Sequence, residues 1–212
     1  YMNDPSKLSV EEVLYAATLT QNPDERKAIF EKAVRLYPND KRAHNGLAQI
    51  AYAKGDMETA KAELAQAAEL PEANANAALI AVREHHLDQA ESLLGKALTA
   101  SNYNEVLGNL QVARGNFVQA AQTLKGVNTN TAALAQILTK DYVSARHTLM
   151  AVPHRDAMTA YLAAIVSART GDVKGAAQAL AGAIAADRSL AGLAQTDLEL
   201  AKVLAAHPEL VK

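Results

Sequence analysis

A segment of this chain repeats about every thirty residues, and this repeat constrains the fold more than any other feature. Three copies, KGDMETAKAELAQA, EHHLDQAESLLGKA and RGNFVQAAQTLKGV, begin at Lys54, Glu84 and Arg114 and align without a gap. Two more copies follow and one precedes them, after steps of twenty-five, thirty-one and thirty-four residues. In five of the six copies one column of the alignment holds alanine, at Ala60, Ala90, Ala120, Ala145 and Ala176. Six copies of one pattern predict a stack of similar supersecondary units.

Within each copy the pattern predicts two helices joined by a tight turn. The turns are expected where glycine is followed by a capping residue, at Gly55-Asp56, Gly115-Asn116 and Gly171-Asp172. After each turn an apolar residue, an alanine and a leucine recur at helical spacing. Pro38 and Pro71 are expected to close second helices. His85 replaces the turn glycine in one copy, so we expect that turn to be strained, lengthened or different in geometry.

Composition supports helices and excludes several classes of function. The chain is 50% hydrophobic but only 4% aromatic, and it is rich in alanine, which suits close-packed helices better than a β-sandwich. The 21 basic and 23 acidic side chains leave a formal charge of −2, so no basic field exists to attract nucleic acid. The absence of cysteine excludes disulfides and thiolate sites. Arg169 ends the apolar run Tyr161–Ala168, which is too short to span a membrane.

The candidate catalytic and metal-binding residues do not form a known constellation. His85 and His86 are adjacent, so on a helix their side chains would point about 100° apart, which disfavours chelation of one metal ion. The acidic pairs Glu11-Glu12 and Asp24-Glu25 lie in predicted first helical turns, where carboxylates stabilise the helix dipole. No nucleophile elbow, phosphate-binding glycine loop or H-E-x-x-H motif occurs. We therefore expect no enzyme activity, no cofactor and no metal.

The best-formed copy, AHNGLAQIAYAKGDMETAKAELAQAAELP over Ala43–Pro71, resembles the tetratricopeptide repeat (TPR) family. Leu47-Ala48, Gly55-Asp56 and Ala60 stand where the family has its Leu-Gly pair, turn and small residue. The resemblance covers residues 8–187 and implies an all-α fold, a right-handed α-solenoid of about six TPR-like helical hairpins. It implies one repeat domain with hairpins over residues 8–40, 41–70, 71–100, 101–127, 128–153 and 154–187. Residues 188–212 are expected to form a C-terminal capping helix and tail.

The resemblance also implies a non-catalytic module that binds a peptide or partner protein in a concave groove lined by the first helices. The residues expected to line that groove for a partner are Tyr15, Arg42, Asn45, Gln49, Tyr52, Glu105, Asn109 and Tyr161. In the third hairpin, the same spacing selects Ala75, Leu79 and Val82. Because asparagine, glutamine and tyrosine outnumber charged groups, we expect binding that depends only weakly on salt. Self-association through the ends of the stack is a further expectation.

Two alternatives concern the setting of the chain. The segment LGNLQVARGNF (Leu107–Phe117) is similar to TPR regions of bacterial envelope proteins of the Bacteroidetes type, which implies a structural part of an envelope assembly. The second alternative is that the chain is the non-catalytic domain of a larger protein. It opens on Tyr1-Met2, so we expect a trimmed piece from which any targeting segment has been lost. The periplasm or cell envelope is slightly favoured over the cytoplasm.

Residues 101–139 carry only three charged side chains but ten asparagine or glutamine residues. Such a stretch is consistent with an ordinary solvated surface. The less favoured alternative is an uncharged polar face that forms hydrogen bonds with an extended peptide backbone.

Overall fold

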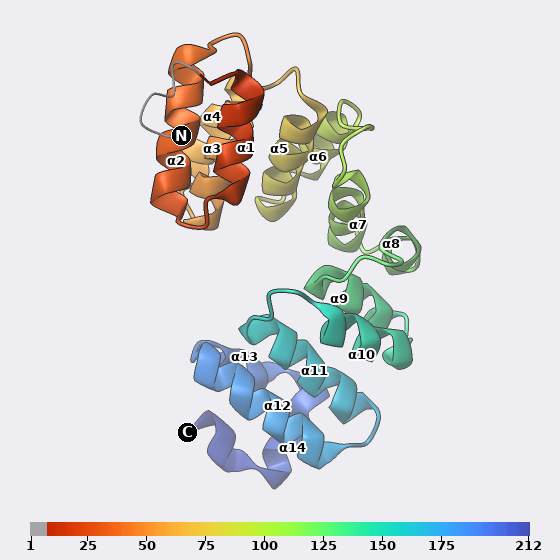
Figure 1. Ribbon diagram of the computed structural model, residues 1–212. Coiled ribbons are helices and arrows are strands. Elements are labelled where there is room, and N and C mark those ends of the chain that lie inside the picture. The colour runs from red at the N-terminus through yellow and green to blue at the C-terminus, as the bar shows by residue number, and fades with distance from the viewer. Residues whose placement is uncertain (1–7) are drawn as a thin grey trace. The chain divides into compact units, whose positions relative to one another are not determined.

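The computed structural model describes residues 8–212, which form helices and contain no strand (Figure 1). This confirms the predicted all-α fold of helical hairpins. The first three hairpins pair α1 (Val10–Leu19) with α2 (Pro23–Leu36), α3 (Arg42–Ala53) with α4 (Met57–Gln66), and α5 (Pro71–Arg83) with α6 (Leu87–Leu94). The next three copies give α7 (Tyr103–Ala113) and α8 (Phe117–Thr123), α9 (Asn130–Leu138) and α10 (Tyr142–Ala151), and α11 (Ala157–Arg169) and α12 (Val173–Ala186).

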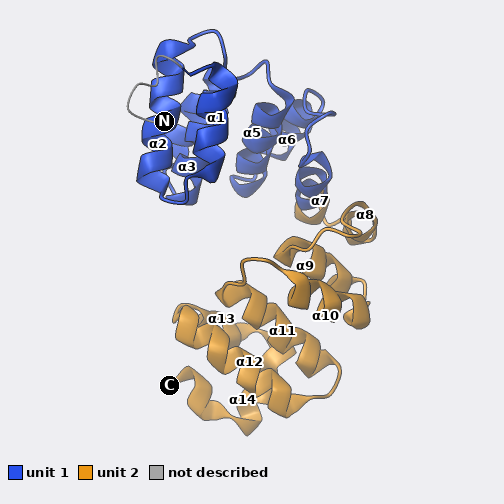
Figure 2. Cartoon of the chain, in the orientation of Figure 1, with its two compact units in different colours: residues 1–110 blue, residues 111–212 orange. Residues whose placement is uncertain are grey.

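The chain divides into two compact units (Figure 2). Unit 1 extends to Leu110 and unit 2 comprises Gln111–Lys212. Each unit has its own buried apolar clusters, so each is described by itself. The sequence-based division into one repeat domain and a C-terminal cap stays a prediction. No helix among residues 8–212 is both long enough and apolar enough to cross a membrane.

The repeated alanine and leucine columns form the centre of the packing. Every member of the alanine column has no exposed surface, and Leu64, Leu94, Leu124, Leu149 and Leu180 are buried beside it. Alanine lets two helix backbones approach closely, and each buried leucine contributes about 1.5–3 kcal/mol relative to an exposed one. The periodicity of the sequence therefore marks the faces on which neighbouring helices pack.

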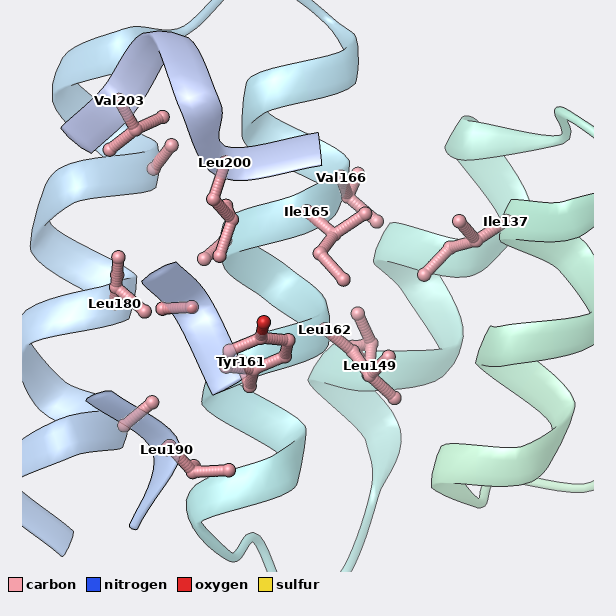
Figure 3. Packing of buried hydrophobic residues seen from close by; sticks show 14 of the residues in the cluster. Ile137, Leu149, Tyr161, Leu162, Ile165, Val166, Leu180, Leu190, Leu200 and Val203 are labelled. Atoms are coloured by element: carbon pink, nitrogen blue, oxygen red, sulfur yellow. The ribbon is translucent and has the colours of Figure 1, made fainter. Parts of the chain in front are cut away.

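The C-terminal segment covers the last hairpin of unit 2. It consists of α13 (Leu190–Thr196), the short 3-10 helix η2 (Leu198–Leu200), α14 (Ala201–Ala206) and η3 (Pro208–Val211). Leu200 and Val203 are buried in the same cluster as Leu180 of α12 and Tyr161 of α11, as Figure 3 shows. The expected cap is thus made of several short helices.

The turn that contains His85 keeps the geometry of the glycine turns. Gly55 has a φ of +80°, and His85 has a φ of 61° in the equivalent place. The backbone N–H after the turn residue donates to a carbonyl five residues earlier in both turns, from Asp56 to Ala51 at 2.9 Å and from His86 to Ala81 at 2.8 Å. Of the three alternatives expected for this turn, the structure shows strain, because a side chain is unfavourable in the left-handed region.

We expect His85→Gly to raise the free energy of unfolding by about 1 kcal/mol, because glycine removes the left-handed penalty at this position. The reverse change, Gly55→His, is expected to lower it by a similar amount. Urea denaturation of both variants measures the two effects. If His85→Gly does not stabilise the protein, strain at this turn is refuted.

Two local predictions about turns are wrong. Pro71 does not close α4, which ends at Gln66; it is the first residue of α5, where its missing N–H costs no helical hydrogen bond. Asn116 precedes α8 but its side chain makes no capping hydrogen bond. Asp56 and Asp172 do cap their helices, with carboxylate oxygens accepting from the backbone N–H of Thr59 and Gly175.

Candidate functional site

Three asparagine side chains in unit 1 are joined by hydrogen bonds from one hairpin to the next. Asn76 of α5 donates through Nδ2 to Oδ1 of Asn45 on α3 at 2.8 Å. Asn102, directly before α7, donates through Nδ2 to Oδ1 of Asn76 at 3.1 Å. All three side chains are half-buried. We call Asn45, Asn76 and Asn102 the asparagine chain; it fixes three amide groups across the first helices of successive hairpins.

A small pocket of about 140 Å³ lies beside the asparagine chain, between α3 and α5. Its apolar floor and polar rim are formed by Ala48, Gln49, Tyr52, Leu64, Asn76, Leu79 and Ile80. Asn76 belongs to both the pocket and the asparagine chain. The pocket is smaller than the roughly 300–1,000 Å³ typical of small-molecule sites. Its size and lining therefore suit one apolar side chain rather than a cofactor.

Tyr52 is held in place by the next hairpin. The guanidinium carbon of Arg83, at the end of α5, lies 5.1 Å from the centre of the Tyr52 ring, which is a cation–π contact. Burial raises the pKa of Tyr52, while Arg83 opposes that shift and the charge of Glu105 adds to it. The phenol hydroxyl is therefore neutral at physiological pH and can both donate and accept a hydrogen bond.

The structure brings together three of the predicted groove residues. Asn45, Gln49 and Tyr52 all lie on α3 and face the same region of α5, through the asparagine chain or the pocket. We call Asn45, Gln49, Tyr52, Asn76, Leu79 and Asn102 the first-helix face of unit 1. These residues offer amide and hydroxyl groups around an apolar floor and carry no net charge.

Arg42 lies on the same helix, but its charge is already compensated. Its guanidinium donates to both carboxylate oxygens of Glu11, at 2.7 and 3.1 Å, and its Nε donates to Asp40 at 3.0 Å. These hydrogen bonds and charges raise the pKa of Arg42 and lower the pKa values of Glu11 and Asp40. Arg42 was predicted to offer a positive charge to a partner, but two carboxylates of unit 1 neutralise that charge.

The other predicted residues of unit 1 are placed differently. Tyr15 is 65% exposed on α1. Glu105 and Asn109 lie one turn apart on α7, where Nδ2 of Asn109 donates to the backbone carbonyl of Glu105 at 2.8 Å. Besides burial, the negative charge of Glu105 raises the pKa of Tyr52, which places Glu105 near the site. Their part in binding stays a prediction.

The prediction for Tyr161 is wrong. This residue is only 2% exposed in unit 2, and its hydroxyl donates to Oδ2 of Asp197 at 2.7 Å. Burial and the Asp197 carboxylate raise its pKa far above the ordinary value. Figure 3 shows its ring within the core of α11 and the C-terminal segment. Tyr161 therefore supports the fold and has no surface to offer a partner.

Sequence reasoning missed Asn76. The constant step of thirty residues places Ala75 opposite Asn45, but Ala75 is fully buried. The hydrogen-bonded neighbour is Asn76, which lies thirty-one residues after Asn45 and so one position beyond the repeat step. The signal that could have found it is the second asparagine in the segment NANAA, next to the selected alanine.

Unit 2 contains a related polar contact between first helices. Thr159 of α11 donates through Oγ1 to Oδ1 of Asn130 on α9 at 2.9 Å, and Asn130 donates through Nδ2 to Asp156 at 3.0 Å. Burial opposes ionisation of Asp156, but hydrogen bonds from Thr159 and Asn130 together lower its pKa. Because Thr159 is only 1% exposed, this contact mainly stabilises the packing of unit 2.

Comparison with known proteins supports the repeat assignment. Residues 41–74 match the family model described as a tetratricopeptide repeat. Among solved structures, a tetratricopeptide repeat protein from Parabacteroides merdae has 13% identity and a TM-score of 0.60, covering 87% of this chain and 81% of its own. PilW, described as a widely conserved type IV pilus biogenesis factor, has 19% identity and a TM-score of 0.62, and the match covers 95% of this chain and 99% of PilW.

PilF from Pseudomonas aeruginosa is also similar, with 18% identity and a TM-score of 0.56 over 93% of this chain and 95% of its own. No curated protein sequence matches the chain. At these identities the structural likeness concerns the fold alone. The family match therefore shows a tetratricopeptide repeat at residues 41–74, and the structural likeness shows that the chain shares the fold of tetratricopeptide repeat proteins.

Proposed function

We propose that the first-helix face of unit 1 binds an extended segment of a partner protein. The TPR fold is in general a protein-interaction scaffold, and the proposal assigns the contact to particular residues. The observation that carries it is the asparagine chain beside an apolar pocket, with Asn76 belonging to both. This combination suits a peptide because a peptide presents amide groups at regular spacing and apolar side chains between them.

The asparagine chain is preorganised for such a ligand. A carboxamide carries two N–H donors and a carbonyl with two acceptor sites, which are the groups that a peptide bond pairs with. Each hydrogen bond within the asparagine chain uses one donor and one acceptor of these carboxamides. The remaining N–H and carbonyl groups are left to form hydrogen bonds with a ligand. Because the side chains are already ordered, less conformational entropy is lost on binding.

The pocket supplies a second element of recognition. With Leu79 and Ile80 in its floor and Tyr52 at its rim, it accommodates one apolar side chain of the bound segment. Since Arg42 is neutralised by Glu11 and Asp40, the binding energy comes mainly from uncharged contacts. We therefore expect the affinity to change little between low and physiological salt.

The proposal can be tested by selecting peptides from a random phage-displayed library on the whole chain. Selected peptides would be synthesised and their dissociation constants measured for the wild type, Asn76→Ala and Tyr52→Ala. We expect each variant to weaken binding about tenfold, because a lost, well-placed hydrogen bond or ring contact is worth about 1–1.5 kcal/mol. The matched control is Gln66→Ala, which removes an exposed amide from α4 and is expected to leave affinity unchanged.

Circular dichroism of each variant establishes that the helices remain folded. Peptides that bind Asn76→Ala and Tyr52→Ala as tightly as the wild type would place the binding surface elsewhere. A steep loss of affinity with added salt would contradict the uncharged mode of binding even if the site were correct.

The role in a bacterial envelope assembly predicted from the sequence also remains a proposal. PilW is described as a pilus biogenesis factor, and this chain shares its fold over nearly its full length. Fractionation of source cells, followed by detection with an antibody against the purified chain, tests the location. Recovery with periplasmic or membrane fractions would support an envelope role, whereas recovery only with cytoplasmic proteins would refute it.

A further inference from the structure

The outward face of α10 in unit 2 carries an unusual set of side chains. Arg146 and His147 lie three and four residues after Val143, and Met150 lies four and three residues after them, so the four side chains share one face of the helix. All four are exposed, Val143 to 71% and Met150 to 68%. The opposite face, with Ala145 and Leu149, packs in the core. Two large apolar side chains thus stand in solvent beside an arginine.

The equivalent helices of the other copies do not share this composition. Aligned on the alanine column, the position of Val143 is occupied by Glu58, Asp88, Val118 and Lys174, and that of Met150 by Ala65, Gly95, Lys125 and Ala181. Packing between hairpins is common to all these copies, so it does not account for Met150. Only the copy in α10 has a large apolar residue in both columns.

A pocket of about 100 Å³ opens beside this face, between α10 and α11. Leu149, Ala163 and Val166 give it an apolar floor, and Arg146, Met150, Arg155 and Ser167 complete the lining. Its size again suits a single side chain. The apolar surface of Met150 therefore continues into the pocket, and the side chains of Arg146 and Arg155 line the same pocket.

The two arginines at the pocket have no carboxylate partner within residues 8–212. Arg146 donates to Oγ1 of Thr170 at 3.2 Å, which is a neutral acceptor. By contrast, Arg169 at the end of α11 is paired with Glu199, and Arg42 in unit 1 is paired with two carboxylates. Among residues 8–212, the positive charges of Arg146 and Arg155 are thus not compensated by a carboxylate.

We propose that this surface, which we call the α10 patch, binds an acidic segment of a partner protein. Carboxylates of the segment pair with Arg146 and Arg155, and an apolar side chain beside them enters the pocket against Met150. The α10 patch lies wholly in unit 2 and does not depend on the proposed peptide site of unit 1. Arginine suits this role because its planar fork can bind a carboxylate through two parallel hydrogen bonds.

The test uses the full chain labelled with ¹⁵N and titrated with the acetylated, amidated pentapeptide Glu-Glu-Leu-Glu-Glu. We expect chemical-shift changes centred on the amides of Ala163, Val166 and Ser167. The double variant Arg146→Gln with Arg155→Gln is expected to weaken binding at least tenfold. Arg188→Gln removes an exposed arginine elsewhere in unit 2 and serves as the matched control, with unchanged affinity expected.

Further measurements distinguish the contribution of the peptide's charge from that of its apolar side chain. They also distinguish a protein partner from a lipid surface. The peptide Gln-Gln-Leu-Gln-Gln is expected to bind at least tenfold more weakly, and Met150→Ser is expected to reduce affinity for the acidic peptide. Equal binding of the two peptides, an unchanged affinity in the double arginine variant, or no shifts at millimolar acidic peptide would each overturn the proposal. Binding to phosphatidylglycerol vesicles that requires both arginines, without peptide binding, would assign the patch to lipid instead.

Discussion

Tyr161→Ala is expected to lower the free energy of unfolding of unit 2 by about 3–5 kcal/mol, the usual cost of deleting a buried aromatic side chain. The ring is enclosed by the core cluster of unit 2, and its hydroxyl is bonded to Asp197. Tyr161→Phe keeps the ring and removes only the hydroxyl, so we expect a smaller loss of about 1–3 kcal/mol, the cost of leaving a polar partner unsatisfied. Urea denaturation followed by circular dichroism measures both losses.

The matched control is Tyr15→Ala, because sequence reasoning assigned Tyr15 and Tyr161 the same role. Tyr15 is largely exposed, so its removal is expected to change stability by no more than about 0.5 kcal/mol. If Tyr161→Ala is no more destabilising than this control, the buried position of Tyr161 is wrong.

Gly46→Val is expected to destabilise unit 1 by about 1–3 kcal/mol, the typical cost of overpacking a well-filled contact. Gly46 lies within α3, directly beneath the ring of Phe30 on α2, and a Cβ atom there would stand 2.5 Å from Phe30 Cζ. The ring would have to leave its place between the two helices. A thermal melt compared with the wild type reports the change.

The comparison variant is Gly182→Val, since Gly182 of α12 has no atom within 4 Å of the corresponding Cβ position. Glycine is a poorer helix former than valine, so this change is expected to be neutral or to stabilise the helix by a few tenths of a kcal/mol, on the order of the difference in propensity. Combining Gly46→Val with Phe30→Ala should cost clearly less than the sum of the two single changes, because the clash is removed. Strict additivity would show that Phe30 does not cover Gly46.

The fold could be predicted from the sequence because its determinants are local and repeated. The alanine column and the leucines that follow it lie four residues apart, and this spacing alone gives the buried stripe of each second helix. The glycine turns were predictable for the same reason, since Gly55 and Asp56 act within one turn of backbone. Pro71 was misassigned because a proline after one helix and a proline at the start of the next look alike in sequence.

The candidate site could be predicted only in part, because exposure depends on contacts that are distant in sequence. Asn45, Gln49 and Tyr52 lie on one helix, and their shared face follows from helical spacing. Tyr161 has the same spacing in its own helix, but the C-terminal segment covers it through Asp197, thirty-six residues later. Asn76 depends on a shift of one residue between neighbouring hairpins, which the thirty-residue alignment does not record.

The asparagine chain also has a direction. In both of its hydrogen bonds the donor belongs to the later hairpin and the acceptor to the earlier one, from Asn102 to Asn76 and from Asn76 to Asn45. The three carboxamides are therefore arranged head to tail, like a hydrogen-bonded row of peptide groups along an α-helix. A bound segment running from its N-terminus to its C-terminus along this row meets a different sequence of donors and acceptors from one running in reverse. The peptide site that we propose would therefore distinguish the polarity of a bound segment.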